Sequence, residues 1–214
     1  MPSISPITFR TSPITFRTRP LLEVLSATPA VVIGRSTGGL IALELARRHP
    51  EKVRALVLLE LAVMTLHPHA AAWAQQLRRT VLEAAEKDPS AVSGVVFREV
   101  LGGEAWESFP AALCGHFADV SPAVLAGIRG RGLDLSQAPL ELSEADAGEI
   151  RRATLIVSAE DSPEALYAVN RRLARLLPNT ETVLVAGGHL IDPAGPAVLE
   201  FLRRHLPPGS PRPD

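Results

Sequence analysis

The sequence predicts an α/β domain in which helices cover a parallel β-sheet. Short, continuous apolar runs rich in β-branched residues alternate with amphipathic helical segments, and glycine or proline separates them. The 214 residues are 46% apolar and 21% charged, which is ordinary for one globular domain. The net charge of −1 indicates no basic surface for nucleic acid, and no apolar run approaches the roughly 18 residues of a membrane span. No apolar segment with a small-residue cleavage site follows the N-terminal arginines, so no secretory signal is indicated. We therefore expect a cytoplasmic protein with no nucleic-acid or membrane partner.

The first 19 residues contain a perfect tandem repeat, SPITFRT at 5–11 and again at 12–18. Two copies are too few for a stacked repeat architecture, so we expect residues 1–19 to be a disordered tail. In an alternative interpretation, the ITFRT segments pair with the edge of the sheet. Residues 207–214 are proline-rich and are also expected to be a disordered tail, which leaves a domain over 20–206.

The domain opens with a short helix at 20–26, followed by a strand, helix and strand. The run AVVIG at 30–34 predicts a strand buried on both faces, and VRALVLL at 53–59 predicts a second one. Between them, 37–49 predicts a helix that Pro50 ends. A helical crossover makes the two strands parallel neighbours.

The segment 64–146 has no strong strand pattern and is expected to form a helical cap. Its helical patterns lie at 69–87, 91–100, 111–117 and 122–128.

The strand pattern returns after the cap. Strands are predicted at 153–158 and 181–186, and each is followed by a helix, at 164–177 and 194–206.

The motif GRSTGG stands between the first strand and the helix after it. A turn of this kind holds Ser36 in a strained conformation, needs small residues at Gly34 and Gly38, and presents the serine hydroxyl at the carboxyl end of the sheet. The Thr37 backbone N–H begins the helix, where free donors favour a developing oxyanion. A phosphate-binding loop is the competing interpretation, but its glycine and lysine pattern is missing. Ser36 is therefore the candidate nucleophile and Thr37 the candidate oxyanion donor.

His189 is the candidate general base. Of the six histidines, it is the one that follows a predicted strand in a loop at the carboxyl end of the sheet, after two glycines that let the loop turn inward. The carboxylate that orients its ring is taken to be Asp161, after the third strand, in the chain order Ser, Asp, His. Glu60, at the end of the second strand, and Glu160 stay open as alternatives.

These segments resemble the α/β-hydrolase superfamily over residues 20–206. GRSTGGLIALELARRHPEKVRALVLLE is similar to its nucleophile elbow with the following helix and strand, and SAEDSPEALYAVNRRLARLLPNTETVLVAGGHLIDPAGPAVLEFL to its acid-and-histidine end. The resemblance implies Ser36 as nucleophile, His189 as base and an acid near Asp161. In the commonest family pattern the acid follows a small residue by three positions, which from Ala159 is Ser162.

The chain departs from the family pattern before the elbow. The family has about four further strands there and a loop that donates a second oxyanion N–H, whereas 35 residues precede Ser36 here. We expect the first strand to be an exposed, β-branched edge that favours a homodimer or aggregation over a stable monomer. Arg35 replaces the histidine often found before the nucleophile and is expected to adjust the pocket.

Two functions follow from these features. The first is an esterase-like serine hydrolase that acts on a small-molecule ester, lactone or amide through an acyl-enzyme, with a catalytic triad and with no cofactor or metal. The alternative is an N-terminally truncated hydrolase that is inactive or serves as a binding or assembly piece. A metal site at His67 and His69 lacks a third ligand. The candidate apolar liners of the pocket are Trp73, Phe97, Trp106, Phe109 and Phe117.

Overall fold

The computed structural model describes residues 22, 25 and 29–206. The SPITFRT repeat, the tail at 207–214 and all but two residues of the helix expected at 20–26 lie outside the described residues. The elements are, in order, β1 (Ala30–Arg35), α2 (Thr37–Arg48), η1 (Pro50–Lys52), β2 (Val53–Leu59), η2 (Met64–Leu66), α3 (Pro68–Lys87), η3 (Pro89–Ala91), α4 (Val92–Leu101), α5 (Gly103–Glu107), α6 (Ala111–Arg129), α7 (Glu144–Glu149), β3 (Ala153–Ala159), α8 (Glu164–Leu176), β4 (Thr180–Val185) and α9 (Pro196–His205).

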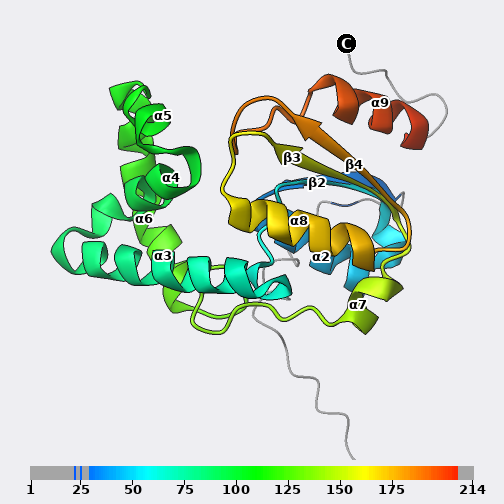
Figure 1. Cartoon of the computed structure of the whole chain (residues 1–214), viewed down its shortest axis with the longest axis horizontal. Coiled ribbons are helices and arrows are strands. Elements are labelled where there is room, and N and C mark those ends of the chain that lie inside the picture. The colour runs from blue at the N-terminus through cyan, green and yellow to red at the C-terminus, as the bar shows by residue number, and fades with distance from the viewer. Residues whose placement is uncertain (1–21, 23–24, 26–28, 207–214) are drawn as a thin grey trace, which may run out of the picture.

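The described residues form one sheet of four parallel strands in the order β1-β2-β3-β4 (Figure 1). The predicted α/β class with a parallel sheet is confirmed. Because the strands are parallel, their carboxyl ends meet at one edge of the sheet, and the loops that follow them gather there. Ser36 follows β1, Glu60 follows β2, Asp161 lies after β3 and His189 after β4.

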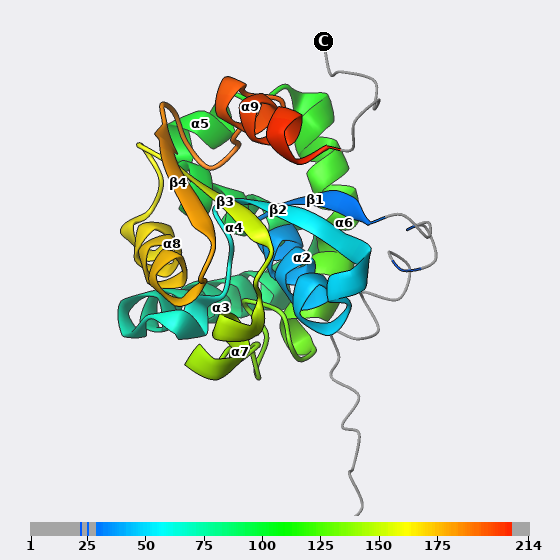
Figure 2. The ribbon, with the colours of Figure 1, turned by 90° about the vertical axis from the view of Figure 1, so that its right-hand side faces the viewer.

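Helices cover both faces of the sheet, with α9 on one face and α2 and α8 on the other (Figure 2). Alternate side chains of β2 point to opposite faces, as strand geometry requires. Leu56 and Leu58 pack in the cluster formed with α2 and α8, whereas Val57 and Leu59 pack with Phe201 of α9. Burial on both faces explains why this strand is a continuous apolar run.

β1 forms one end of the sheet and pairs with β2 in the part of the chain that is described. Ile33 keeps 38% of its surface exposed, and Val31 and Val32 are half-buried. The exposed β-branched edge predicted from the sequence is therefore present among the described residues.

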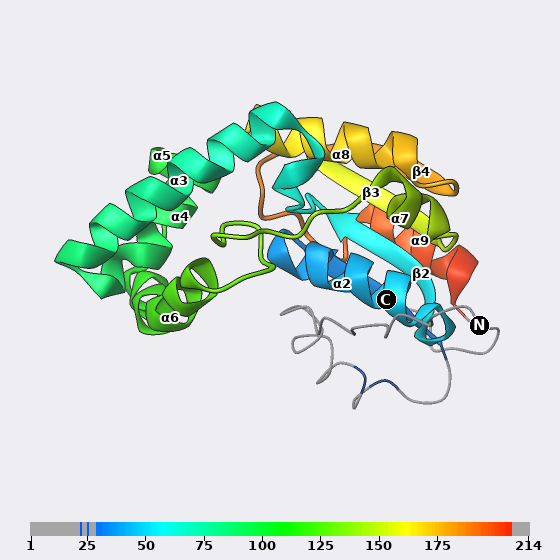
Figure 3. The same ribbon diagram turned by 90° about the horizontal axis from the view of Figure 1, so that it is seen from below.

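The helices α3 to α6, which we call the helical cap, stand beside the sheet (Figures 1 and 3). Helix α4 packs against both α3 and α6. The Ser93 backbone N–H donates to the Ser121 hydroxyl oxygen at 3.0 Å and ties α4 to α6. Four aromatic side chains pack against one another in the cap, namely Phe97, Trp106, Phe109 and Phe117.

The helices expected at 111–117 and 122–128 are one helix, α6, with Pro122 inside it. Proline removes one backbone donor, but packing of α6 against α4 and η3 outweighs that loss. Within the described residues, α6 is also the one helix that is long and apolar enough to cross a membrane. Helices of soluble proteins pass the same test, so length and composition alone are weak evidence for a span.

Candidate active site

Ser36 stands between the last residue of β1 and the first residue of α2. Its backbone has φ 52° and ψ −123°, a conformation that costs a non-glycine residue about 1–3 kcal/mol. Neighbouring backbone groups hold it there. The Ser36 N–H donates to the Leu59 carbonyl oxygen at 3.0 Å, and the Ser36 carbonyl oxygen accepts from the Gly39 N–H at 2.9 Å.

The elbow needs small residues, but the structure corrects one of their positions. A Cβ on Gly34 would lie 2.4 Å from the Gly38 carbonyl oxygen, so only glycine fits there. A Cβ on Gly38 would meet nothing within 4 Å, because this residue faces outward on α2. A Cβ on Gly39 would lie 3.2 Å from the Gly34 carbonyl oxygen and 3.3 Å from the Cα of Leu61. The steric constraint expected at Gly38 therefore falls on Gly39.

His189 is buried in the loop after β4, and its ring contacts a buried carboxylate. The His189 Nδ1 lies 2.7 Å from Glu60 Oε2, and Glu60 has no exposed surface. The Ala159 N–H donates to Glu60 Oε1 at 3.0 Å, and the Ser162 hydroxyl donates to Glu60 Oε2 at 2.7 Å. This environment suits an Nδ1–H that donates to the carboxylate, which leaves the Nε2 lone pair available as a base.

The carboxylate beside His189 is therefore Glu60, and the first choice of Asp161 is corrected. Asp161 is exposed, and its backbone N–H donates to the Gly187 carbonyl oxygen at 2.9 Å. Glu160 is exposed as well. Ser162 occupies the position that the commonest family pattern gives to the acid, and it hydrogen-bonds the carboxylate that comes instead from the neighbouring strand.

Backbone strain also singles out Glu60. Among the described residues, Ser36 and Glu60 are the two non-glycine residues with positive φ, 52° and 46°. They follow the adjacent strands β1 and β2, so the two strained turns lie next to each other at the edge of the sheet. Strain of this kind persists where the surroundings over-determine the backbone, and it concentrates at functional sites.

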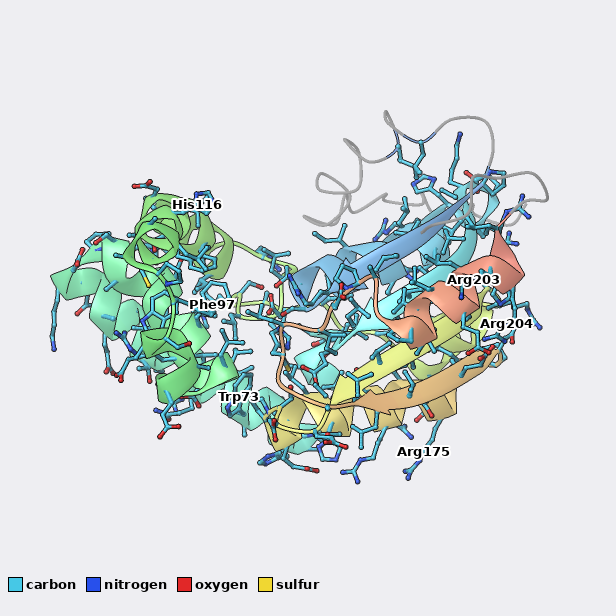
Figure 4. All side chains as sticks on the ribbon, turned by 90° about the horizontal axis from the view of Figure 1, so that it is seen from above. Trp73, Phe97, His116, Arg175, Arg203 and Arg204 are labelled. Atoms are coloured by element: carbon cyan, nitrogen blue, oxygen red, sulfur yellow. The ribbon has the colours of Figure 1, made fainter. Side chains whose placement is uncertain are left out.

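A pocket of about 370 Å³ joins Ser36 and His189 to the helical cap. Its cap side is apolar and includes Trp73 and Val124. Of the five aromatic residues expected as liners, Trp73 lines the pocket, while the other four pack together inside the cap. Figure 4 shows Trp73 and Phe97 on the cap side of the molecule and Arg175 at a distance on α8.

Asp134 also lines this pocket, and the sequence does not predict it. The residue lies between α6 and α7 in a segment with no periodic pattern, so no sequence signal distinguished it. The Thr37 hydroxyl donates to Asp134 Oδ1 at 3.0 Å. Burial raises the pKa of the Asp134 carboxyl, and the hydrogen bond from Thr37 opposes that rise only in part.

In the described part of the chain, no cluster of three or more histidine, cysteine, aspartate or glutamate side chains is arranged to hold a metal ion. His67 instead serves the start of α3, where its Nδ1 accepts from the His69 backbone N–H at 3.3 Å.

A family model supplies the identification. The model described as the alpha/beta hydrolase fold matches residues 18–192, well over half of the sequence. The chain belongs to the alpha/beta hydrolase fold family. The predicted resemblance is thereby confirmed, and the four-stranded parallel sheet is the family's core in a short form.

Solved structures share the fold of this hydrolase-family chain. Est816, an N-acyl homoserine lactone degrading enzyme, aligns with a TM-score of 0.64 at 21% identity, over 92% of this chain and 75% of the other. MenH from S. aureus aligns with a TM-score of 0.66 at 18% identity, over 95% and 80%. MGS-M2, an alpha/beta hydrolase enzyme from a deep-sea metagenome library of the Medee basin, aligns with a TM-score of 0.57 at 19% identity, over 82% and 62%.

Proposed function

We propose that this chain is a serine hydrolase that cleaves an ester, lactone or amide through an acyl-enzyme. The observation that carries the proposal is that Ser36, on a strained elbow, opens into the same pocket as His189, whose ring contacts the buried Glu60. Nucleophile, base and orienting carboxylate are the three parts that such a reaction needs. The similarity to a lactone-degrading enzyme supports the reaction class without identifying a substrate.

The first half of the reaction forms the acyl-enzyme. The Ser36 Oγ attacks the substrate carbonyl carbon while the His189 Nε2 takes the hydroxyl proton, and Glu60 stabilises the imidazolium through Nδ1–H. The negative charge that develops on the carbonyl oxygen is stabilised by the Thr37 backbone N–H at the start of α2. His189 then protonates the leaving alcohol or amine as its bond to the carbonyl carbon breaks.

The second half releases the acid. Water attacks the acyl carbon of the Ser36 ester while His189 takes one of its protons. The tetrahedral intermediate collapses, the bond to Ser36 Oγ breaks, and His189 returns the proton to the serine. The chain's own residues supply every proton transfer in this cycle.

Labelling with a fluorophosphonate, read out by intact mass, tests this proposal. We expect one probe per chain, no labelling in Ser36→Ala, and strongly slowed labelling in His189→Ala. Circular dichroism and cooperative thermal unfolding establish that each sample is folded. Equal labelling of the Ser36→Ala chain, or no labelling of folded wild-type protein, would contradict the proposal and favour the binding or assembly role.

A further inference from the structure

Asp134 is the acidic side chain in the lining of an otherwise mainly apolar pocket. Its carboxylate is attached to the elbow, because the hydroxyl that donates to Asp134 Oδ1 at 3.0 Å belongs to Thr37, the residue after Ser36. The same Thr37 carries the backbone N–H at the start of α2. The Asp134 carboxyl group is therefore attached to the residue that follows the nucleophile, and it lines the pocket into which Ser36 opens.

The surroundings of Asp134 leave room for one further donor. The Thr37 hydroxyl and the backbone N–H groups of Asp134 and Leu135 hydrogen-bond to its carboxyl group, and a carboxylate can accept about four hydrogen bonds. Leu133, Leu135 and Met64 line the pocket around it. A ligand that filled this space with hydrocarbon alone would remove water from the carboxylate without replacing its hydrogen bonds, which is costly.

Three other ionisable side chains line the two cavities that Asp134 shares. His189 lines the same pocket, and Arg78 and Arg79 line a second cavity, of about 320 Å³, whose wall also includes Asp134. The apolar pocket thus presents one fixed acceptor near the nucleophile and hydrocarbon surface farther into the cap, where Val124 and Ile128 lie.

We propose that Asp134 selects acyl groups that carry an N–H donor close to the reacting carbonyl and an apolar tail beyond it, as in N-acylated α-amino acid esters and lactones. The inference rests on the proposed hydrolase activity and names the substrate class of that site. The N–H donates to the Asp134 carboxylate, the scissile carbonyl lies at Ser36, and the tail occupies the cap side of the pocket.

Three p-nitrophenyl esters of matched length test this assignment. They are the N-acetylglycinate, which has the N–H, the N-acetyl-N-methylglycinate, which lacks it, and the pentanoate, which has a hydrocarbon chain. The measured quantity is the ratio of kcat/KM for the first ester to that for the second. Comparing this ratio between variants cancels the intrinsic reactivity of each ester.

We expect the ratio to fall about tenfold or more in Asp134→Ala, since the substrate N–H then loses the acceptor that binds it. Asp134→Asn keeps an acceptor oxygen without the charge and should give an intermediate ratio. Ser136→Ala is the matched control, because Ser136 lines the same pocket but donates its hydroxyl to the Leu133 carbonyl oxygen. Its ratio should equal that of the wild type.

A ratio that is the same in wild type, Asp134→Ala and Asp134→Asn would overturn the assignment. Binding to the Ser36→Ala chain separates this failure from failure of the proposed hydrolase. By calorimetry, N-hexanoylglycine methyl ester should bind about tenfold more tightly than its N-methyl form, and Asp134→Ala in the same background should abolish the difference. Equal affinities for the two ligands would reject the role of Asp134, whether or not the chain hydrolyses esters. Ester hydrolysis that is absent, or that does not depend on Ser36, would reject only the catalytic proposal.

Discussion

Arg35 Nη1 donates a hydrogen bond to the Ile191 carbonyl oxygen at 3.2 Å and thereby joins the residue before the nucleophile to the loop that carries His189. Arg35 is the last residue of β1, at one end of the described sheet, whereas the His189 loop follows β4 at the other end. Ile191 belongs to this loop, and its side chain is buried. This hydrogen bond thus connects the loop that carries His189 to the nucleophile elbow, across the carboxyl ends of the strands.

Replacing Arg35 with alanine should lower kcat for ester hydrolysis by about tenfold, because small displacements of a catalytic group are costly. The melting temperature should change little, since one partly buried hydrogen bond contributes about 0.5–1.5 kcal/mol. Steady-state kinetics and thermal unfolding measure the two effects. Arg175→Ala, on the exposed surface of α8, is the control and should leave both unchanged. An Arg35→Ala enzyme with wild-type kcat would show that the His189 loop does not need this contact.

Glu60→Gln should reduce kcat by about a thousandfold or more, because a neutral amide neither stabilises the imidazolium nor selects the required tautomer. Asp161→Asn should retain activity within about twofold, since that side chain is exposed and the loop is held by the hydrogen bond from the Asp161 backbone N–H to the Gly187 carbonyl oxygen. Ester hydrolysis by the two purified variants decides between the carboxylates. The reverse ranking would restore Asp161 as the acid.

Gly34→Ala should prevent the elbow from forming, because the new Cβ would lie 2.4 Å from the Gly38 carbonyl oxygen. We expect loss of fluorophosphonate labelling and a destabilisation of about 3 kcal/mol or more, which is typical of severe overpacking. Gly38→Ala is the matched control. It meets nothing within 4 Å and lies in α2, so it should keep its stability or gain about 0.5–1 kcal/mol. Urea denaturation and labelling of both chains provide the comparison, and equal behaviour would refute the steric argument.

Glu44 should make the stability of the fold depend on acidic pH. Burial by itself would raise the pKa of this carboxyl, but hydrogen bonds from Arg47 Nε at 2.6 Å and Arg48 Nε at 2.7 Å outweigh it, and the pKa is lowered. A lowered pKa in the folded state gives stability that is present above the unfolded value of about 4.3 and is lost as the pH falls through the folded value.

Urea denaturation from about pH 7 to about pH 3 tests this dependence. Glu44→Gln should be less stable by about 1–3 kcal/mol near neutral pH and should lose less stability on acidification than the wild type. Glu83→Gln, on the exposed surface of α3, should follow the wild-type curve. Parallel curves for wild type and Glu44→Gln would remove Glu44 as the source of the acid sensitivity.

Much of the core could be predicted because buried parallel strands are continuous apolar runs. The strand expected at 53–59 has the same bounds as β2, and the strand expected at 153–158 is one residue shorter than β3. The cap was less predictable. The five-residue α5 and the six-residue α7 are too short to show a period, and packing carries α6 through a proline that usually ends a helix.

The sequence by itself determined the fold class, the elbow at Ser36 and the histidine at position 189, because a strand, a turn with glycine and a helix are adjacent in the chain and leave a local pattern. Only the tertiary structure decided which carboxylates serve the site. Glu60 meets His189 across 129 positions, and Asp134 meets Thr37 across 97. A hydrogen bond depends on a fit of a few tenths of an ångström between groups that folding brings together. Local periodicity carries no information about that distance.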